Sequence, residues 1–339
     1  MNILADATLP DVATLFKTPF KLTWYDQDDH VPALIADQTI LLCRSTLKVT
    51  ADLLKNTAIQ CVATASSGTD HIDTDYLRSH GIALIDAKGS NAQAVTDYVI
   101  ASAAYLQQQG YLHGMRAGVV GAGEVGSRVA HRLKTVGFDV VVFDPLKAQH
   151  DSQFISCAFE ALTQCHLVCV HANLHETSPY PSKNLFDLQA LQQLRPDVCL
   201  INASRGGIVN ENALLALRQP IVYCTDVYCN EPNIEPRIVD YATLCTPHIA
   251  GHSIEAKQYA VIQVSEQLHR HYGLVMPVHS KQRRDSTDFD RMLNANWQHT
   301  VLGYYNPCVE TQLLKSAQDK RQAFLLQRQA HQFRHDFSI

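Results

Sequence analysis

The sequence lacks the features that would assign it to a membrane, a secretory route or a nucleic-acid complex. No stretch approaches the ~18–20 consecutive apolar residues of a membrane span. Residues 1–6 lack the basic flank and long apolar core of a signal peptide. With 28 Lys and Arg against 33 Asp and Glu, the formal net charge of -5 indicates neither nucleic acid nor a membrane as partner. We therefore expect a cytoplasmic protein that binds an anionic substrate only through a local basic pocket.

The ten cysteines also lack any Cys-x-x-Cys spacing. Most of them lie inside apolar runs, as Cys43, Cys61, Cys169, Cys199 and Cys224 do. This placement is typical of small buried side chains in a reducing compartment, so we expect neither a disulfide framework nor a metal site.

Short apolar runs alternate with helical patterns along most of the chain. A length of 339 residues indicates two or three domains. In the first 90 residues, the runs are Ile3–Ala5, Ile40–Cys43, Cys61–Thr64 and Ile82–Ile85. Further runs at Ala117–Val120, Val140–Phe143, Leu167–Val170, Val198–Ile201, Ile221–Thr225 and Leu244–Thr246 predict a six-stranded sheet. The alternation predicts an α/β protein with two doubly wound parallel sheets.

A glycine-rich turn links the run Ala117–Val120 to a helical pattern. It reads Gly-x-Gly-x-x-Gly at Gly121, Gly123 and Gly126. The next apolar run ends in Asp144, whose carboxylate suits the ribose hydroxyls of NAD and repels the 2′-phosphate of NADP. The helix N-terminus would bind the cofactor's phosphates. The alternative is a purely structural strand-to-helix turn.

Three polar residues follow later strands of the same predicted sheet. Arg205, in Ser-Arg-Gly-Gly, has the bidentate geometry that a carboxylate requires. His248 titrates in the range of a base that takes a hydroxyl proton during hydride transfer, and Glu231 would orient its ring. Taken singly, a histidine before a helix is more often a cap or a surface residue, and Arg-Gly-Gly is often only a turn. Together, they indicate a dehydrogenase site.

At these motifs, the chain resembles the D-isomer-specific 2-hydroxyacid dehydrogenases. The segments that carry the resemblance cover residues 1 to about 272: Asn2–Asp6, Leu42–Thr46, Thr64–Asp73, Gly89–Ala92, Gly121–Gly126, Ile201–Gly206 and Thr246–Gly251. Tyr305–Glu310 and Arg321–Phe337 resemble the C-terminal dimerisation region of one branch, whose members oxidise 4-phospho-D-erythronate. The resemblance implies an NAD-binding Rossmann-type domain at 92–252 inserted in a flavodoxin-like substrate domain at 1–91 and 253–275. It also implies a small, helix-rich dimerisation region at 276–339, and thus a homodimer.

The resemblance also implies site residues. Arg205, Glu231 and His248 would be catalytic. Arg44, Ser45, Ser66 and His252 would contact the substrate. Residues placed against NAD are Gly121, Gly123, Glu124, Val125, Gly126, Asp144, Ala172, Ala203, Ser204, Arg205, Asp226 and Gly251. From the residues alone, Arg44, Ser45 and Lys48 form a basic cluster that could hold a phosphate, or a solvated loop with incidental charges.

The chain departs from the pattern of that branch at four places. His252 stands where a tyrosine is usual, Ser66 replaces a threonine, Lys88 replaces a proline, and the tail is shorter. Two alternatives therefore stay open. One is another dehydrogenase of the family, for phosphoglycerate, glyoxylate or hydroxypyruvate. The other is a catalytically idle relative that senses NAD and recruits partners.

Overall fold

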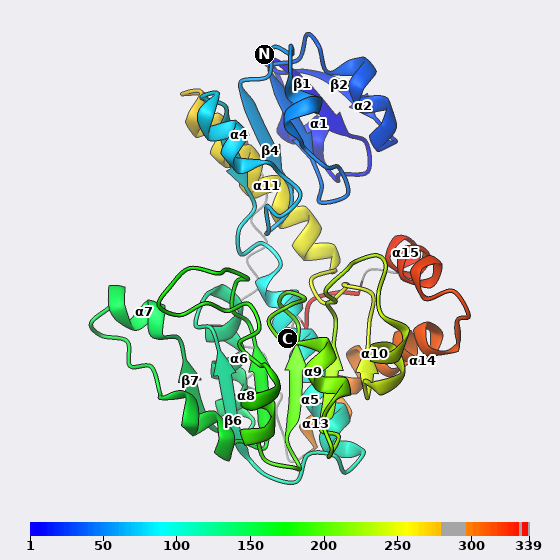
Figure 1. Ribbon diagram of the computed structural model, residues 1–339. Coiled ribbons are helices and arrows are strands. Elements are labelled where there is room, and N and C mark those ends of the chain that lie inside the picture. The colour runs from blue at the N-terminus through cyan, green and yellow to red at the C-terminus, as the bar shows by residue number, and fades with distance from the viewer. Residues whose placement is uncertain (279–295, 332–333, 338–339) are drawn as a thin grey trace. The chain divides into compact units, whose positions relative to one another are not determined.

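The structure is a computed structural model that describes residues 1–278, 296–331 and 334–337 (Figure 1). The described chain forms two compact units. The first comprises Met1–Asn91 and the described residues from Ser253 to 278. The second comprises Ala92–His252 and the described residues from 296 onward. Parts of the predicted dimerisation region at 276–339, namely residues 279–295, 332–333 and 338–339, lie outside the described residues.

The first unit is built on a five-stranded parallel sheet in the order β2-β1-β3-β4-β5. The strands are β1 (Asn2–Asp6), β2 (Lys21–Tyr25), β3 (Ile40–Cys43), β4 (Cys61–Thr64) and β5 (Ala83–Asp86). Strand β3 and strand β4 are fully buried, as expected when helices cover both faces of a parallel sheet. The sheet order is flavodoxin-like.

Short helices and one long helix cover this first sheet. They are α1 (Val12–Leu15), η1 (Asp28–His30), α2 (Val31–Leu34), α3 (Ala51–Leu54), α4 (Thr74–Ser79) and α11 (Ile254–His271). Helix α11 begins after Ser253, whose side chain accepts a hydrogen bond from the Ala256 N–H and so caps the helix N-terminus. Its apolar face packs against β1, β3 and β4 through Ala260, Val264 and Leu268.

The second unit contains a six-stranded parallel sheet in the order β11-β10-β9-β8-β6-β7. The strands are β6 (Arg116–Val120), β7 (Asp139–Phe143), β8 (Leu167–Val170), β9 (Cys199–Asn202), β10 (Val222–Thr225) and β11 (Leu244–Cys245). From β6, the chain first forms β7 on one side of β6 and then returns to form β8 on the opposite side of β6. Ligands bind beyond the strand carboxyl ends at such a reversal. The predicted fold class is confirmed.

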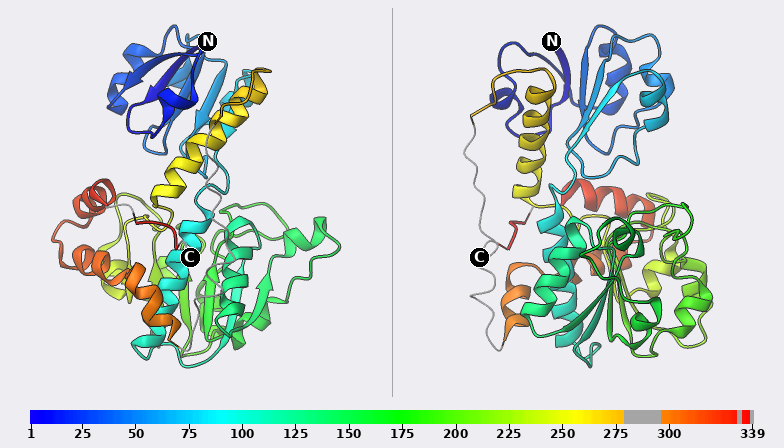
Figure 2. Two further views of the ribbon diagram at one scale, coloured as in Figure 1. Left: turned by 180° about the vertical axis from the view of Figure 1, so that it is seen from behind. Right: turned by 90° about the vertical axis from the view of Figure 1, so that its left-hand side faces the viewer.

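Helices lie on both faces of this sheet (Figure 2). Helix α5 (Ala92–Gln108), α6 (Glu124–Thr135) and α13 (Trp297–Tyr304) share one apolar core. The remaining helices of the unit are α7 (Pro145–His150), η2 (Phe159–Gln164), α8 (Leu188–Gln193), α9 (Glu211–Leu215), α10 (Pro236–Tyr241), α14 (Cys308–Ser316) and α15 (Lys320–Ala330). Helix α14 lies along the β11 edge, where Thr311 accepts a hydrogen bond from the Cys245 N–H at 2.9 Å. The C-terminal helices therefore belong to the body of this unit.

The ten cysteines are free thiols, and seven of them are buried. Burial raises the pKa of Cys61 to about 12, so this thiol remains protonated. No helix in the described parts of the chain is both long and apolar enough to cross a membrane.

Candidate active site

The glycine-rich turn after β6 has the backbone geometry of a dinucleotide-binding loop. Gly121 has φ +88°, and a Cβ there would lie 2.7 Å from the backbone nitrogen of Ala172. A Cβ on Gly126 would lie 1.8 Å from the Gly121 carbonyl oxygen. At Gly123, the N-cap of α6, a Cβ would meet no atom of the described residues within 4 Å. The first and third glycines thus allow close packing, while the second leaves open space in front of a helix N-terminus.

Two observations beside this turn bear on whether the residues fit a dinucleotide. Both ring nitrogens of His171, directly after β8, are buried and have no hydrogen-bond partner among the described residues. Burial lowers the pKa of His171 to about 3, so the ring is neutral and can donate or accept. A hollow is lined by Phe143 and Pro145, the sequence neighbours of Asp144, and by Tyr180. Open space, a helix N-terminus and unpaired polar atoms at the sheet reversal fit a dinucleotide.

Asp144 holds the glycine turn in place. Its Oδ2 accepts a hydrogen bond from the Ala122 N–H at 2.8 Å. Its Oδ1 caps α7 through the Lys147 N–H. Glu124 pairs with Arg128 at 2.7 Å on the exposed side of α6. The predicted contacts of Asp144, Glu124 and Val125 with NAD therefore stay predictions, and the carboxylate of Asp144 also has a structural task.

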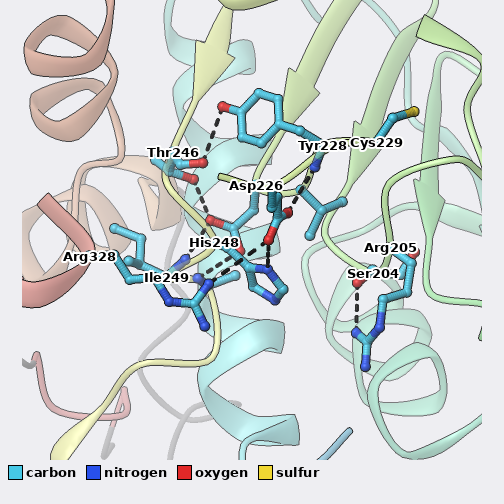
Figure 3. A network of polar contacts seen from close by, with 12 residues as sticks. Ser204, Arg205, Asp226, Tyr228, Cys229, Thr246, His248, Ile249 and Arg328 are labelled. Carbon is cyan, nitrogen blue, oxygen red and sulfur yellow. Dashed lines mark hydrogen bonds and ion pairs between the residues drawn. The ribbon is translucent and has the colours of Figure 1, made fainter. Parts of the chain in front are cut away.

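Three neighbouring strands present the predicted catalytic residues. Arg205 follows β9, Glu231 lies in the loop after β10, and His248 lies after β11. Because these strands are parallel and adjacent, their carboxyl ends share one edge of the sheet. Figure 3 shows the Arg205 and His248 side chains extending toward the same side of that edge. Nη1 of Arg205 donates to the Ser204 carbonyl at 2.8 Å.

His248 and Glu231 form a hydrogen-bonded pair. Nδ1 of His248 lies 2.6 Å from Oε2 of Glu231. Because a carboxylate only accepts, Nδ1 carries the proton, and in the neutral ring Nε2 is the acceptor. The Tyr228 N–H donates to the other oxygen, Oε1. Burial opposes ionisation of Glu231, but His248, the Tyr228 N–H and Arg328 outweigh it and hold its pKa below the usual value.

Asp226 fixes the backbone that carries His248. His248 has a left-handed φ of +56°, which is uncommon for a residue with a side chain. The buried Asp226 carboxylate accepts hydrogen bonds from the Ile249 N–H, the Ala250 N–H and the Thr246 hydroxyl. Burial raises the pKa of Asp226, against the effect of His248 and these hydrogen bonds. The predicted contact of Asp226 with NAD stays a prediction, and in the structure its carboxylate binds the backbone on the C-terminal side of His248.

The other predicted contacts of the second unit follow the same strand ends. Ala172 packs against Gly121, and Ser204 donates to Asn202 through its hydroxyl and its N–H. Ala203 follows β9 and Gly251 follows Ala250. The His252 ring lies 5.9 Å from that of His331, between ring centroids.

The predicted substrate residues of the first unit follow two adjacent strands, β3 and β4. Nε of Arg44 lies 2.6 Å from Oδ2 of the buried Asp6, which fixes the guanidinium. Ser45 is exposed next to it, and Ser66 is half-buried. Burial, together with the charge of Arg44, lowers the pKa of Lys257 on α11 to about 8. Sequence reasoning did not predict this second cation near Arg44, because 213 positions separate them in the sequence.

Comparison with known proteins places this geometry in a class. The family described as D-isomer specific 2-hydroxyacid dehydrogenase, NAD binding domain, matches residues 88–250. NAD⁺-bound 3-phosphoglycerate dehydrogenase from Entamoeba histolytica shares the fold, with a TM-score of 0.67, 20% identity, and coverage of 83% of this chain and 99% of that one. An NAD-dependent formate dehydrogenase from Staphylococcus aureus has a TM-score of 0.63 at 21% identity, covering 80% and 96% of the two chains. The second unit is thus an NAD-binding dehydrogenase domain.

Relatives of higher identity define the branch. Erythronate-4-phosphate dehydrogenase from Legionella pneumophila (strain Philadelphia 1) is 51% identical over 338 residues, which cover 100% of this chain and 96% of the relative. The protein of that name from Coxiella burnetii (strain RSA 331) is 36% identical over 280 residues, covering 81% of this chain and 75% of the relative. The chain belongs to the erythronate-4-phosphate dehydrogenase family, and the predicted resemblance is confirmed.

Proposed function

We propose that this protein is the NAD-dependent dehydrogenase that oxidises 4-phospho-D-erythronate to 2-oxo-3-hydroxy-4-phosphobutanoate in pyridoxal 5′-phosphate (vitamin B6) biosynthesis. The hydrogen-bonded pair of His248 and Glu231 on the NAD-binding unit is the observation that carries the proposal. A protein that only senses NAD has no need of a proton acceptor paired with a carboxylate. The name of the 51% identical relative supports the substrate.

The chain's own residues perform the proton and binding steps. Arg205 binds the substrate carboxylate through its guanidinium fork. Nε2 of His248 takes the proton of the C2 hydroxyl, and Glu231 stabilises the imidazolium through Nδ1. Asp226 holds the His248 loop by its hydrogen bonds to the backbone. NAD, when bound, supplies the hydride acceptor.

The phosphate of the substrate requires cations, and the first unit presents a group of them. Arg44 is fixed by Asp6, and Lys257 lies close enough for their charges to interact. We assign the phosphate to Arg44, Ser45 and Lys257, with Ser66 and His252 as further substrate contacts. These assignments stay predictions to be tested by substitution.

We also propose that the protein is a cytoplasmic homodimer. Ten free thiols fit a reducing compartment. Apolar side chains are exposed on the C-terminal helices, among them Val309, Leu313, Leu325 and Leu326. Exposed apolar groups on neighbouring helices are typical of an interface, and a second copy is the proposed occupant. Sedimentation analysis of Leu313→Glu and Leu326→Glu tests this: a dimer in the native protein and a monomer in the variants is expected, whereas a native monomer refutes it.

The substrate assignment is tested with purified protein, NAD and a panel of acids. NADH formation from 4-phospho-D-erythronate should exceed that from D-erythronate, 3-phosphoglycerate and glycerate. Preference for an unphosphorylated acid, or for 3-phosphoglycerate, rejects the substrate and leaves another dehydrogenase of the family. NAD binding without NADH formation from any 2-hydroxy acid favours the idle relative.

A further inference from the structure

Helix α15 packs directly on the segment that carries Glu231. Its side chain Phe324 is 2% exposed, and its ring meets that of Tyr228 edge-on, with ring centroids 6.0 Å apart. Tyr228 is also the residue whose N–H donates to Glu231 Oε1. The C-terminal helix and the catalytic carboxylate therefore contact the same residue.

Arg328 lies one helical turn beyond Phe324, on the same face of α15. Its Nη1 lies 4.0 Å from Oε2 of Glu231, the same oxygen that lies 2.6 Å from Nδ1 of His248. Figure 3 shows its guanidinium beside the His248 ring. A separation of 4.0 Å is too long for a hydrogen bond, so Arg328 acts on Glu231 through its charge.

A second arginine of the tail supports the backbone on the other side of His248. Nη2 of Arg334 donates to the carbonyls of Ala94 and Ala250, at 2.6 and 2.8 Å. Ala250 belongs to the loop that Asp226 holds. The C-terminal segment therefore contacts the environment of the catalytic pair twice.

We propose that Arg328 is a positioning residue of the Glu231–His248 pair, whose positive charge keeps Glu231 ionised and limits how strongly the pair holds its proton. This inference rests on the proposed function, and it gives the C-terminal region a role in catalysis in addition to assembly. No signal in the sequence links Arg328 to Glu231, which lies 97 positions earlier.

The charges around the Glu231–His248 pair determine whether removing Arg328 raises or lowers the pH at which the pair loses its proton. From the α9 side, Glu211 faces Glu231, and Asp226 lies next to His248. Burial raises the pKa of both of these carboxyls. Arg328 contributes positive charge against these acidic groups, so its removal makes the surroundings more negative. The pair then retains its proton to higher pH, and fewer molecules have a base ready at a given pH.

The test compares pH profiles of kcat/KM for NADH formation from 4-phospho-D-erythronate. Arg328→Met removes the charge and keeps the stem, Arg328→Lys restores the charge, and Arg321→Met removes an exposed arginine of the same helix. The acid limb should move to higher pH by about 0.5–1 unit in Arg328→Met, as expected for a charge that lies 4.0 Å from Glu231 Oε2 in a partly solvated site. Arg328→Lys should return it most of the way, and Arg321→Met should leave it in place.

Two outcomes overturn the proposal. One is an acid limb that stays in place in Arg328→Met. The other is a tenfold or larger rise in KM with an unmoved limb, which would make Arg328 a substrate ligand. Thermal melting and NAD binding confirm that the variants fold, and Arg328→Gln replaces Arg328→Met should the latter aggregate.

A second readout separates this proposal from the proposed function. NMR titration of the His248 imidazole signal, assigned by its loss in His248→Gln, needs no turnover. Its midpoint should rise in Arg328→Met even if no tested acid is a substrate. An unchanged midpoint refutes the role of Arg328, whereas native protein that oxidises no 2-hydroxy acid refutes only the function.

Discussion

Replacing Gly206 by alanine should damage the active site without touching a functional side chain. A Cβ on Gly206 would lie 2.0 Å from the Tyr228 carbonyl oxygen and 2.6 Å from the Cys229 backbone nitrogen. Ordinary contacts begin at 3.4 Å, so the first distance is 1.4 Å too short. Because both contacts are to backbone atoms, rotation of a side chain cannot relieve the clash. The loops after β9 and β10 must separate instead.

The size of the effect follows from that shortfall. Overpacking of this kind costs about 1–3 kcal/mol in the free energy of unfolding. The displaced loops carry Arg205 and Tyr228, and the backbone N–H of Tyr228 donates a hydrogen bond to Glu231. Misplacement by about 1 Å costs roughly 10²-fold in rate, so kcat/KM should fall by about that factor.

The measurements are urea unfolding and steady-state NADH formation. Gly303→Ala is the matched control, because Gly303 lies in α13 and a Cβ there meets no atom within 4 Å. That variant should keep full activity and gain about 0.5–1 kcal/mol of stability. Gly206→Ala protein with turnover within about twofold of the native enzyme and unchanged unfolding would refute the reasoning.

Three further predictions concern single side chains. His248→Ala should lose about 10²–10⁴-fold in kcat while NAD still binds, as rates and NAD fluorescence titration would show; near-native turnover contradicts its role as base. Glu231→Gln should be roughly 1–2 kcal/mol less stable at pH 7. Because folding lowers the pKa of Glu231, its ionised carboxylate stabilises the fold fully at pH values above the pKa of the unfolded chain, and this stabilisation is lost as pH falls through the pKa of the folded protein. The difference in unfolding free energy between the native protein and Glu231→Gln should therefore disappear in acid. A difference that stays constant in urea unfolding from pH 7 to pH 3 would contradict this role of Glu231. Arg44→Met should raise KM for the phosphorylated acid about tenfold or more, while Arg78→Met, an exposed change in the same unit, should not; equal KM values would remove Arg44 from the phosphate site.

The six strands of the second sheet could be predicted because each contains an unbroken apolar run, and β8, β9 and β11 are buried along their whole length. Strand β2 was not predicted. Among the described strands it is an edge strand paired with β1 alone, and Lys21 and Trp24 are exposed. Its sequence, Lys-Leu-Thr-Trp-Tyr, therefore shows neither an apolar run nor a clear alternation.

The candidate site could be predicted in part, for a related reason. Glycines and polar residues directly after a strand are visible in the sequence, so Gly121, Asp144 and His248 could be selected. Whether a carboxylate faces a ligand or its own backbone is not visible, and Asp226 accepts hydrogen bonds from the next loop. Residues such as Arg328 and Lys257 reach their partners only through packing of distant helices, which no local pattern encodes.

The buried carboxylate of Asp97 depends on residues synthesised much later. Asp97 is completely buried on α5, where it pairs with Arg132 and accepts a hydrogen bond from the Phe337 N–H, 240 positions further along. Desolvation raises its pKa, and Arg132, Arg334 and that N–H act against this effect. A nascent chain that has been synthesised only as far as β11 therefore lacks two of the groups that stabilise the buried Asp97 carboxylate. The second unit can reach its final packing only after residue 337 has been synthesised.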